Sequence, residues 1–131
     1  MKHLFLCAAM SLMAGPGWAQ DAQTGRGDYE RYCATCHGLE ARGKGPMGPS
    51  LLLQPTDLTQ LAAKNEGIFP TLRVVARIDG SDPLVSHGSP MPVYGMFFQG
   101  KGVPLRTETG QMVMTSQPIV DLVAYLEGLQ E

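Results

Sequence analysis

The distribution of apolar and polar positions along the chain predicts short helices joined by loops. The clearest helical pattern lies near the C-terminal end, where apolar residues recur at spacings of three and four: Ile119, Leu122, Val123, Leu126 and Leu129. This spacing places all five on one face of a helix. Ser116 as the cap and Pro118 in the first turn are typical of a helix start. We therefore expect a final helix that begins at Ser116 and buries one face.

Three earlier stretches are also expected to be helical, namely residues 22–33, 57–64 and 70–78. Asp21 or Thr24 suits the first of them as a cap, and Gly80 suits the last as a C-terminal stop. The stretches 38–56 and 81–92 contain many glycines and prolines, so we expect loops there.

The region before the final helix is less regular. Val103–Arg106 and Gln111–Met114 flank Thr107–Gly110, an arrangement compatible with a small β-hairpin. Neither an internal repeat nor a second domain boundary is evident. Because any strands would be minor, the pattern predicts a single all-α domain over residues 20–131.

The first nineteen residues have the features of a secretory signal peptide. Lys2 precedes an apolar run from Leu4 to Met13, and small residues lead to a cleavage point after Ala19. The run is short for a bilayer span, although an uncleaved N-terminal anchor is the alternative. We expect residues 1–19 to be removed on export and the mature chain to be a soluble periplasmic protein without stable membrane insertion.

Composition narrows the functional classes. The 131 residues carry a formal charge of −2, which gives no support to nucleic-acid binding. Three cysteines are too few for a disulfide-dense scaffold, and Cys7 lies in the predicted signal peptide. With 16 glycines and 10 prolines the chain is loop-rich, so something other than a large protein core is expected to hold it together.

The two remaining cysteines form the sequence Cys33-Ala34-Thr35-Cys36-His37, the C-x-x-C-H signature of covalent haem attachment. Two thiols three positions apart on a helical turn can each add to a vinyl group of one haem, and the next residue then presents an imidazole to the iron. The alternatives are a Cys33–Cys36 disulfide and a zinc site. The first needs a thioredoxin-like sheet, and the second needs four ligands where this motif supplies three.

A sixth iron ligand must come from elsewhere, and methionine is common in electron carriers. The candidates after the motif are Met47, Met91, Met96, Met112 and Met114. Met91 is favoured because Pro90 and Pro92 stiffen the backbone on both sides of it. His87 is a further candidate, and for the other methionines core packing is the better interpretation.

At this point the mature chain resembles the class I cytochromes c. That family has a glycine and an aromatic residue before the haem cysteines, matched here by Gly25 and Tyr29. In the family both pack against an aliphatic and an aromatic residue of the last helix, and Leu122 and Tyr125 match these by spacing. The resemblance implies a cytochrome c fold, in which short helices surround one covalent haem c and the N- and C-terminal helices cross.

The resemblance also implies iron ligation by His37 and Met91, and it gives a supporting role to Pro49. In Gly48-Pro49-Ser50-Leu51, the Pro49 carbonyl would accept the second ring N–H of His37 and fix its tautomer. A longer string resembles one bacterial single-haem subgroup: Pro55-Thr56-Asp57-Leu58-Thr59, Gly67-Ile68-Phe69-Pro70, Ile78-Asp79-Gly80, His87-Gly88 and Met91-Pro92-Val93-Tyr94-Gly95.

Residues 95–115 depart from the family's minimal pattern, because smaller members pass from the methionine to the last helix in far fewer residues. This insertion would cover the haem edge or shape a partner surface. Apolar residues expected either to wall the haem pocket or to form ordinary core are Leu51, Leu52, Phe69, Val75, Phe97 and Phe98.

The function expected from the sequence is that of a monomeric periplasmic carrier of one electron between redox proteins, without enzymatic activity. The mature chain has three lysines, so docking would be weakly electrostatic. Two alternatives remain: a haem subunit bound permanently to a larger dehydrogenase or reductase, and a small peroxidase or gas sensor with an open sixth position.

Overall fold

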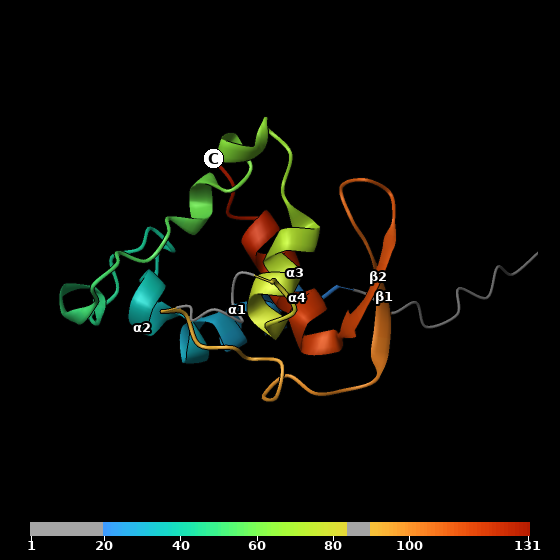
Figure 1. Cartoon of the computed structure of the whole chain (residues 1–131), viewed down its shortest axis with the longest axis horizontal. Coiled ribbons are helices and arrows are strands. Elements are labelled where there is room, and N and C mark those ends of the chain that lie inside the picture. Colours follow the sequence, from blue (N-terminus) through green and yellow to red (C-terminus); the bar gives the residue numbers. More distant parts are fainter. Residues whose placement is uncertain (1–19, 84–89) are drawn as a thin grey trace, which may run out of the picture.

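The computed structural model describes residues 20–83 and 90–131, so the predicted signal peptide and His87 lie outside the described residues. Figure 1 shows helices gathered on one side and a β-hairpin on the other. The helices are α1 (Ala22–Tyr32), α2 (Ala34–His37), α3 (Thr71–Asp79) and α4 (Gln117–Glu127), with 3₁₀ turns η1 (Gly48–Ser50), η2 (Leu58–Gln60) and η3 (Ala63–Asn65). The hairpin consists of β1 (Gly102–Arg106) and β2 (Met112–Ser116).

Helices α1 and α4 cross at a glycine, as the resemblance implied. A Cβ at Gly25 would overlap the backbone carbonyl of Asp121, so only glycine allows this approach. Beside the crossing, the rings of Tyr29 and Tyr125 lie 5.3 Å apart between centroids. Leu122 and Tyr29 are almost fully buried there. The predicted packing of the two terminal helices is therefore confirmed.

Most helix boundaries agree with the sequence pattern. The Asp21 side chain caps α1 by accepting hydrogen bonds from the Gln23 and Thr24 amides. Helix α3 begins directly after Pro70 and ends at Gly80, which has a left-handed φ of 86°. Ser116 takes the N-cap position of α4.

The helix expected over residues 57–64 is wrong, because this stretch forms the two 3₁₀ turns η2 and η3. The Asp57 carboxylate accepts from the Thr59 amide, and the Ala62 amide donates to the side chain of Gln130. An α-helix would join the Ala62 amide to the Leu58 carbonyl, but the side chain of Gln130 bonds to both groups. Glu66, at the end of η3, adopts a left-handed φ of 59°.

The hairpin is a modest departure from the expected all-α class. Its strands pair antiparallel with Pro104 opposite Met114, and Gly110 takes a positive φ in the connecting turn. Val103 and Leu105 are buried, whereas Met112 and Met114 are exposed. The hairpin compatible with the sequence thus forms, and the domain is helical with one two-stranded sheet. Across residues 20–83 and 90–131, no helix combines the length and apolar character needed to span a membrane.

Candidate haem site

The C-x-x-C-H motif forms one helical turn at the end of α1. The Cys33 amide donates to the Tyr29 carbonyl, which closes α1, and the His37 amide donates to the Cys33 carbonyl, which closes α2. Both cysteines are half-buried and line the same cavity as His37. The turn therefore presents two thiols and an imidazole to one space, as haem attachment requires.

A tight loop fixes the far end of this turn. Helix ends leave carbonyls without intrahelical partners. Here the Gly43, Gly45 and Met47 amides donate to the carbonyls of His37, Cys36 and Thr35, at 2.8 to 3.0 Å. A Cβ at Gly45 would lie 2.6 Å from the Cys36 carbonyl carbon. The glycine content of this loop therefore lets the backbone wrap the motif closely.

The ring of His37 is buried and held by one backbone carbonyl. Its Nδ1 lies 2.9 Å from the Thr56 oxygen. Because a carbonyl only accepts, Nδ1 carries the proton and Nε2 keeps a free lone pair. Burial lowers the pKa of His37, while the bond to Thr56 opposes that shift. The neutral imidazole that iron requires is thus the form that the fold favours.

This contact corrects the assignment to Pro49, because the Thr56 carbonyl takes the role expected for Pro49. Gly48–Ser50 instead forms the turn η1, whose Leu51 amide donates to Gly48. The segment that reaches His37 comes later, where the Leu58 amide donates to Ala41 and Gly43 lies against the Pro55 carbonyl. The family spacing from His37 pointed to Pro49, whereas the residue that contacts His37 directly follows a later proline, Pro55.

The motif opens into a cavity of about 570 Å³, within the usual range for small-molecule and cofactor sites. Met91 lines this cavity together with Cys33, Cys36 and His37. The other four candidate methionines do not line it and are exposed: Met47, Met96, Met112 and Met114. The structure therefore brings one thioether to the predicted site.

Much of the cavity wall is apolar, although not with all the residues expected. Leu51 lines the cavity as predicted. The other apolar lining residues include Leu58 in η2, Leu61 directly after η2, Val74 on α3, and Leu122 and Leu126 on α4. Phe69, Val75 and Phe98 are buried in the protein core instead. Leu52 and Phe97 neither wall the cavity nor belong to the core, so both expected roles are wrong for them. The side chain of Phe97 is exposed, and that of Leu52 is fully exposed.

Three cations also line the cavity, a feature that the sequence analysis missed. They are Lys64 in η3, and Arg73 and Arg77 one turn apart on α3. None of the described residues that line the cavity is acidic, although the chain as a whole is slightly negative. Arg77 forms an ion pair with Asp82 at 3.3 Å. The site thus combines an apolar interior with positive charge, which suits a flat apolar group that bears carboxylates.

The competing interpretations of the cysteines fit the geometry less well. Cys33 and Cys36 are not joined by a disulfide, and burial raises the pKa of Cys33 to about 12, whereas redox-active thiols have a lowered pKa. Over residues 20–83 and 90–131, no group of three or more His, Cys, Asp or Glu side chains is arranged to hold a metal ion. The donor set fits haem, with two thiols for the vinyl groups and His37 and Met91 for iron.

Comparison with models of protein families gives a match. The family model described as cytochrome c oxidase, cbb3-type, subunit III matches residues 20–126, which spans the site and both crossing helices. No curated protein and no solved structure matches the chain.

Proposed function

Because the chain belongs to the cbb3-type family of c-type cytochrome domains, which bind haem and carry electrons, we propose that it is a periplasmic single-haem carrier. In this role it would pass one electron between redox proteins, and His37 and Met91 are the residues that would bind the haem iron. The observation that carries the proposal is the cavity lined jointly by Cys33, Cys36, His37 and Met91.

Bound haem supplies an iron that changes between Fe(III) and Fe(II), and the protein's own groups set the conditions for this change. Thr56 holds the proton on Nδ1 of His37, so Nε2 stays available as a ligand. The thioether of Met91 is a soft ligand that favours the reduced state. Apolar residues from α3 and α4 line the cavity and would keep water away from the haem. Lys64, Arg73 and Arg77 supply positive charge for the two haem carboxylates.

Covalent attachment is tested by replacing the thiols. In the haem-loaded protein, made in a host with haem-maturation machinery, haem should remain on the chain through denaturing electrophoresis. The double variant Cys33→Ser, Cys36→Ser should lose all covalent haem, since no thiol remains in the mature chain. Covalent haem in the double variant would contradict the proposed attachment, as would a well-folded colourless wild type.

Ligation by Met91 has its own test. Met91→Ala should remove the weak red absorption band of Fe(III)–thioether ligation and allow carbon monoxide to bind the reduced protein readily. The matched control is Met96→Ala, because Met96 is exposed and outside the cavity. Loss of the band in the control instead would move the ligand to Met96. Ready binding of carbon monoxide to the wild type would favour a peroxidase or gas sensor.

A second candidate role is that of a haem subunit fixed in a larger complex. It is favoured by exposed apolar side chains in and beside the hairpin, among them Met96, Phe97, Met112 and Met114. The family description also names an oxidase subunit. A free carrier should elute from a periplasmic extract as a monomer, whereas a fixed subunit should elute with its partner and be captured with it.

A further inference from the structure

Tyr94 lines the candidate haem cavity but is not one of the predicted iron ligands. It follows Met91 by three residues, lines the same cavity and is half-buried. Its ring packs among aromatic neighbours, with centroid separations of 6.3 Å to Tyr32 and 5.9 Å to Phe98. The residue therefore lies between the segment of Met91 and the end of α1.

The backbone beside Tyr94 is docked on the C-terminal end of α3. The Tyr94 amide donates to the Ile78 carbonyl at 2.8 Å. A Cβ on Gly95 would overlap the Asp79 carbonyl, and a Cβ on Gly80 would overlap the side chain of Val93. Residues 93–95 thus pack closely against one end of a helix, which limits where the chain just before them can lie.

The side chain of Tyr94 makes a second attachment, to a different helix. Its hydroxyl donates to the Tyr32 carbonyl at 2.9 Å. Tyr32 is the last residue of α1 and directly precedes Cys33. Carbonyls in the last turn of a helix need partners from outside it, and Tyr94 supplies one. One residue therefore connects the Met91 segment both to α3 and to the haem-attachment turn.

We propose that Tyr94 is a positioning residue, whose hydroxyl holds the Met91 segment against the end of α1 and so keeps the thioether at the cavity. The inference rests on the proposed function, because it takes Met91 to be the sixth ligand. The hydrogen bond joins residues 62 positions apart, so it is lost as soon as the Met91 segment moves away. It should therefore act directly on the equilibrium between the bound and released methionine.

The protein contains a matched hydrogen bond on the opposite ligand's side. The Tyr29 hydroxyl donates to the Gly38 carbonyl at 2.6 Å and is buried beside His37. Removing either hydroxyl deletes one tyrosine-to-carbonyl bond and leaves the ring in place. Both variants should lose some stability. Only the variant that lacks the Tyr94 hydroxyl should release Met91 from the iron more readily.

The experiment compares the haem-loaded Tyr94→Phe and Tyr29→Phe variants by titrating the oxidised protein with imidazole, which competes with the methionine. Tyr94→Phe should bind imidazole about fivefold more tightly, as expected for the loss of one hydrogen bond. Tyr29→Phe should keep the wild-type affinity. Gly95→Ala, which displaces the same segment from α3, should also raise imidazole affinity.

Three results would overturn the inference. They are an unchanged affinity in Tyr94→Phe, an equal rise in Tyr29→Phe, and a rise that scales with the loss in melting temperature across all three variants. The failure of the proposed ligation is separable, because the wild type would then lack the red thioether band before any variant is compared. A wild type with the band and a Tyr94→Phe variant with unchanged imidazole affinity would overturn only the role of Tyr94.

Discussion

The two predicted iron ligands are held in different ways. On the His37 side, contacts fix the ring itself through Thr56 and the backbone carbonyl through Gly43. On the Met91 side, the contacts described above lie three residues further along the chain, at Tyr94. These contacts thus hold the ring of His37 itself, whereas on the methionine side they hold a residue three positions after Met91.

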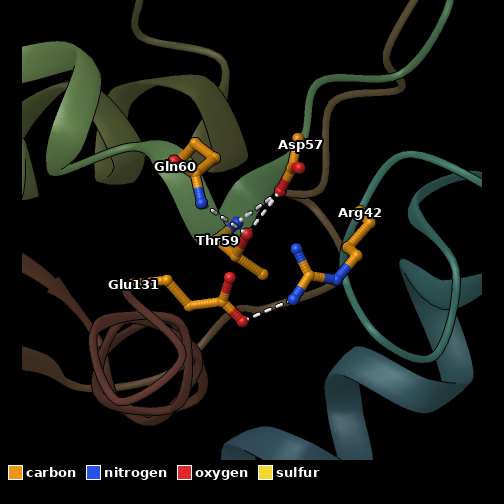
Figure 2. Close-up of polar contacts among 5 residues, drawn as sticks. All are labelled: Arg42, Asp57, Thr59, Gln60 and Glu131. Atoms are coloured by element: carbon orange, nitrogen blue, oxygen red, sulfur yellow. Dashed lines mark hydrogen bonds and ion pairs between the residues drawn. The ribbon is translucent and has the colours of Figure 1, made fainter.

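The C-terminal residues extend the support on the His37 side. Gln130 donates to the Leu58 carbonyl and accepts from the Ala62 amide. The Glu131 amide donates to the Thr59 carbonyl, and Figure 2 shows the Glu131 carboxylate paired with Arg42. The segment just after Thr56 is therefore tied to the end of α4. The comparison teaches that the His37 ring is held directly and its partner segment is tied down by several further bonds, whereas the Met91 segment is held through Tyr94.

The largest effect should come from breaking the loop that wraps the motif. Gly45→Ala places a Cβ against the carbonyls of Thr35 and Cys36, which are backbone atoms that cannot move aside easily. We expect a loss of about 3 kcal/mol in the free energy of unfolding of the haem-loaded protein, measured with urea.

The matched control for this change is Gly27→Ala, on an exposed part of α1. Apart from its chain neighbours and the backbone of α1 itself, nothing in the described part of the chain lies within 4 Å of a Cβ there, so the substitution should stabilise the helix by up to about 1 kcal/mol. Equal effects of the two variants would show that the loop is not the rigid part of the His37 side.

The next largest effect is expected at Gln130. Gln130→Ala removes the hydrogen bonds to Leu58, Ala62 and the Leu126 carbonyl, at 2.7 to 2.9 Å. Since two of these tie down the segment that follows Thr56, the free energy of unfolding should fall by about 2 kcal/mol. Gln23→Ala on the exposed surface of α1 is the control. Imidazole affinity should stay unchanged, because the Met91 side is not touched; a rise would mean that the two sides are coupled.

Removing a positive charge at the cavity should lower the reduction potential of the haem iron without releasing His37 or Met91. Arg77→Gln removes a positive charge from the cavity lining. The loss of this charge stabilises Fe(III) relative to Fe(II). The reduction potential should fall by about 30 mV, since the charge is partly screened by solvent and paired with Asp82. Spectroelectrochemical titration measures this shift, with Arg106→Gln on the hairpin as control. A lost thioether band in Arg77→Gln would show instead that α3 positions Met91 through this arginine.

The sequence predicted the parts of this protein that depend on local chemistry. The C-x-x-C-H turn and the stop at Gly80 follow from residue types at fixed spacing, and the α1–α4 crossing at Gly25 is what the resemblance to the class I cytochromes c implied. The partner of His37 does not, because Pro49 and Thr56 both follow a turn-forming residue and only packing selects between them.

Long-range contacts also explain the other features that the sequence analysis did not predict. The cations Arg73 and Arg77 lie one helical turn apart, but the pattern could not say that this face of α3 meets the cavity. The expected helix over 57–64 gave way to 3₁₀ turns partly because Gln130, far away in the sequence, takes the Ala62 amide. Features set by tertiary hydrogen bonds were therefore the ones that the sequence did not reveal.

The smallest effect is expected from the ion pair between Arg42 and Glu131, which are joined at 2.5 Å. Both side chains are roughly half exposed, so water and salt screen their attraction and the pair should contribute about 0.5 kcal/mol. Arg42→Gln should lower the free energy of unfolding by that amount at low salt, and the difference should vanish near 1 M salt. A loss as large as that of Gln130→Ala would mean that the charged contact, and not the partly buried amide of Gln130, secures the C-terminal residues to the His37 side.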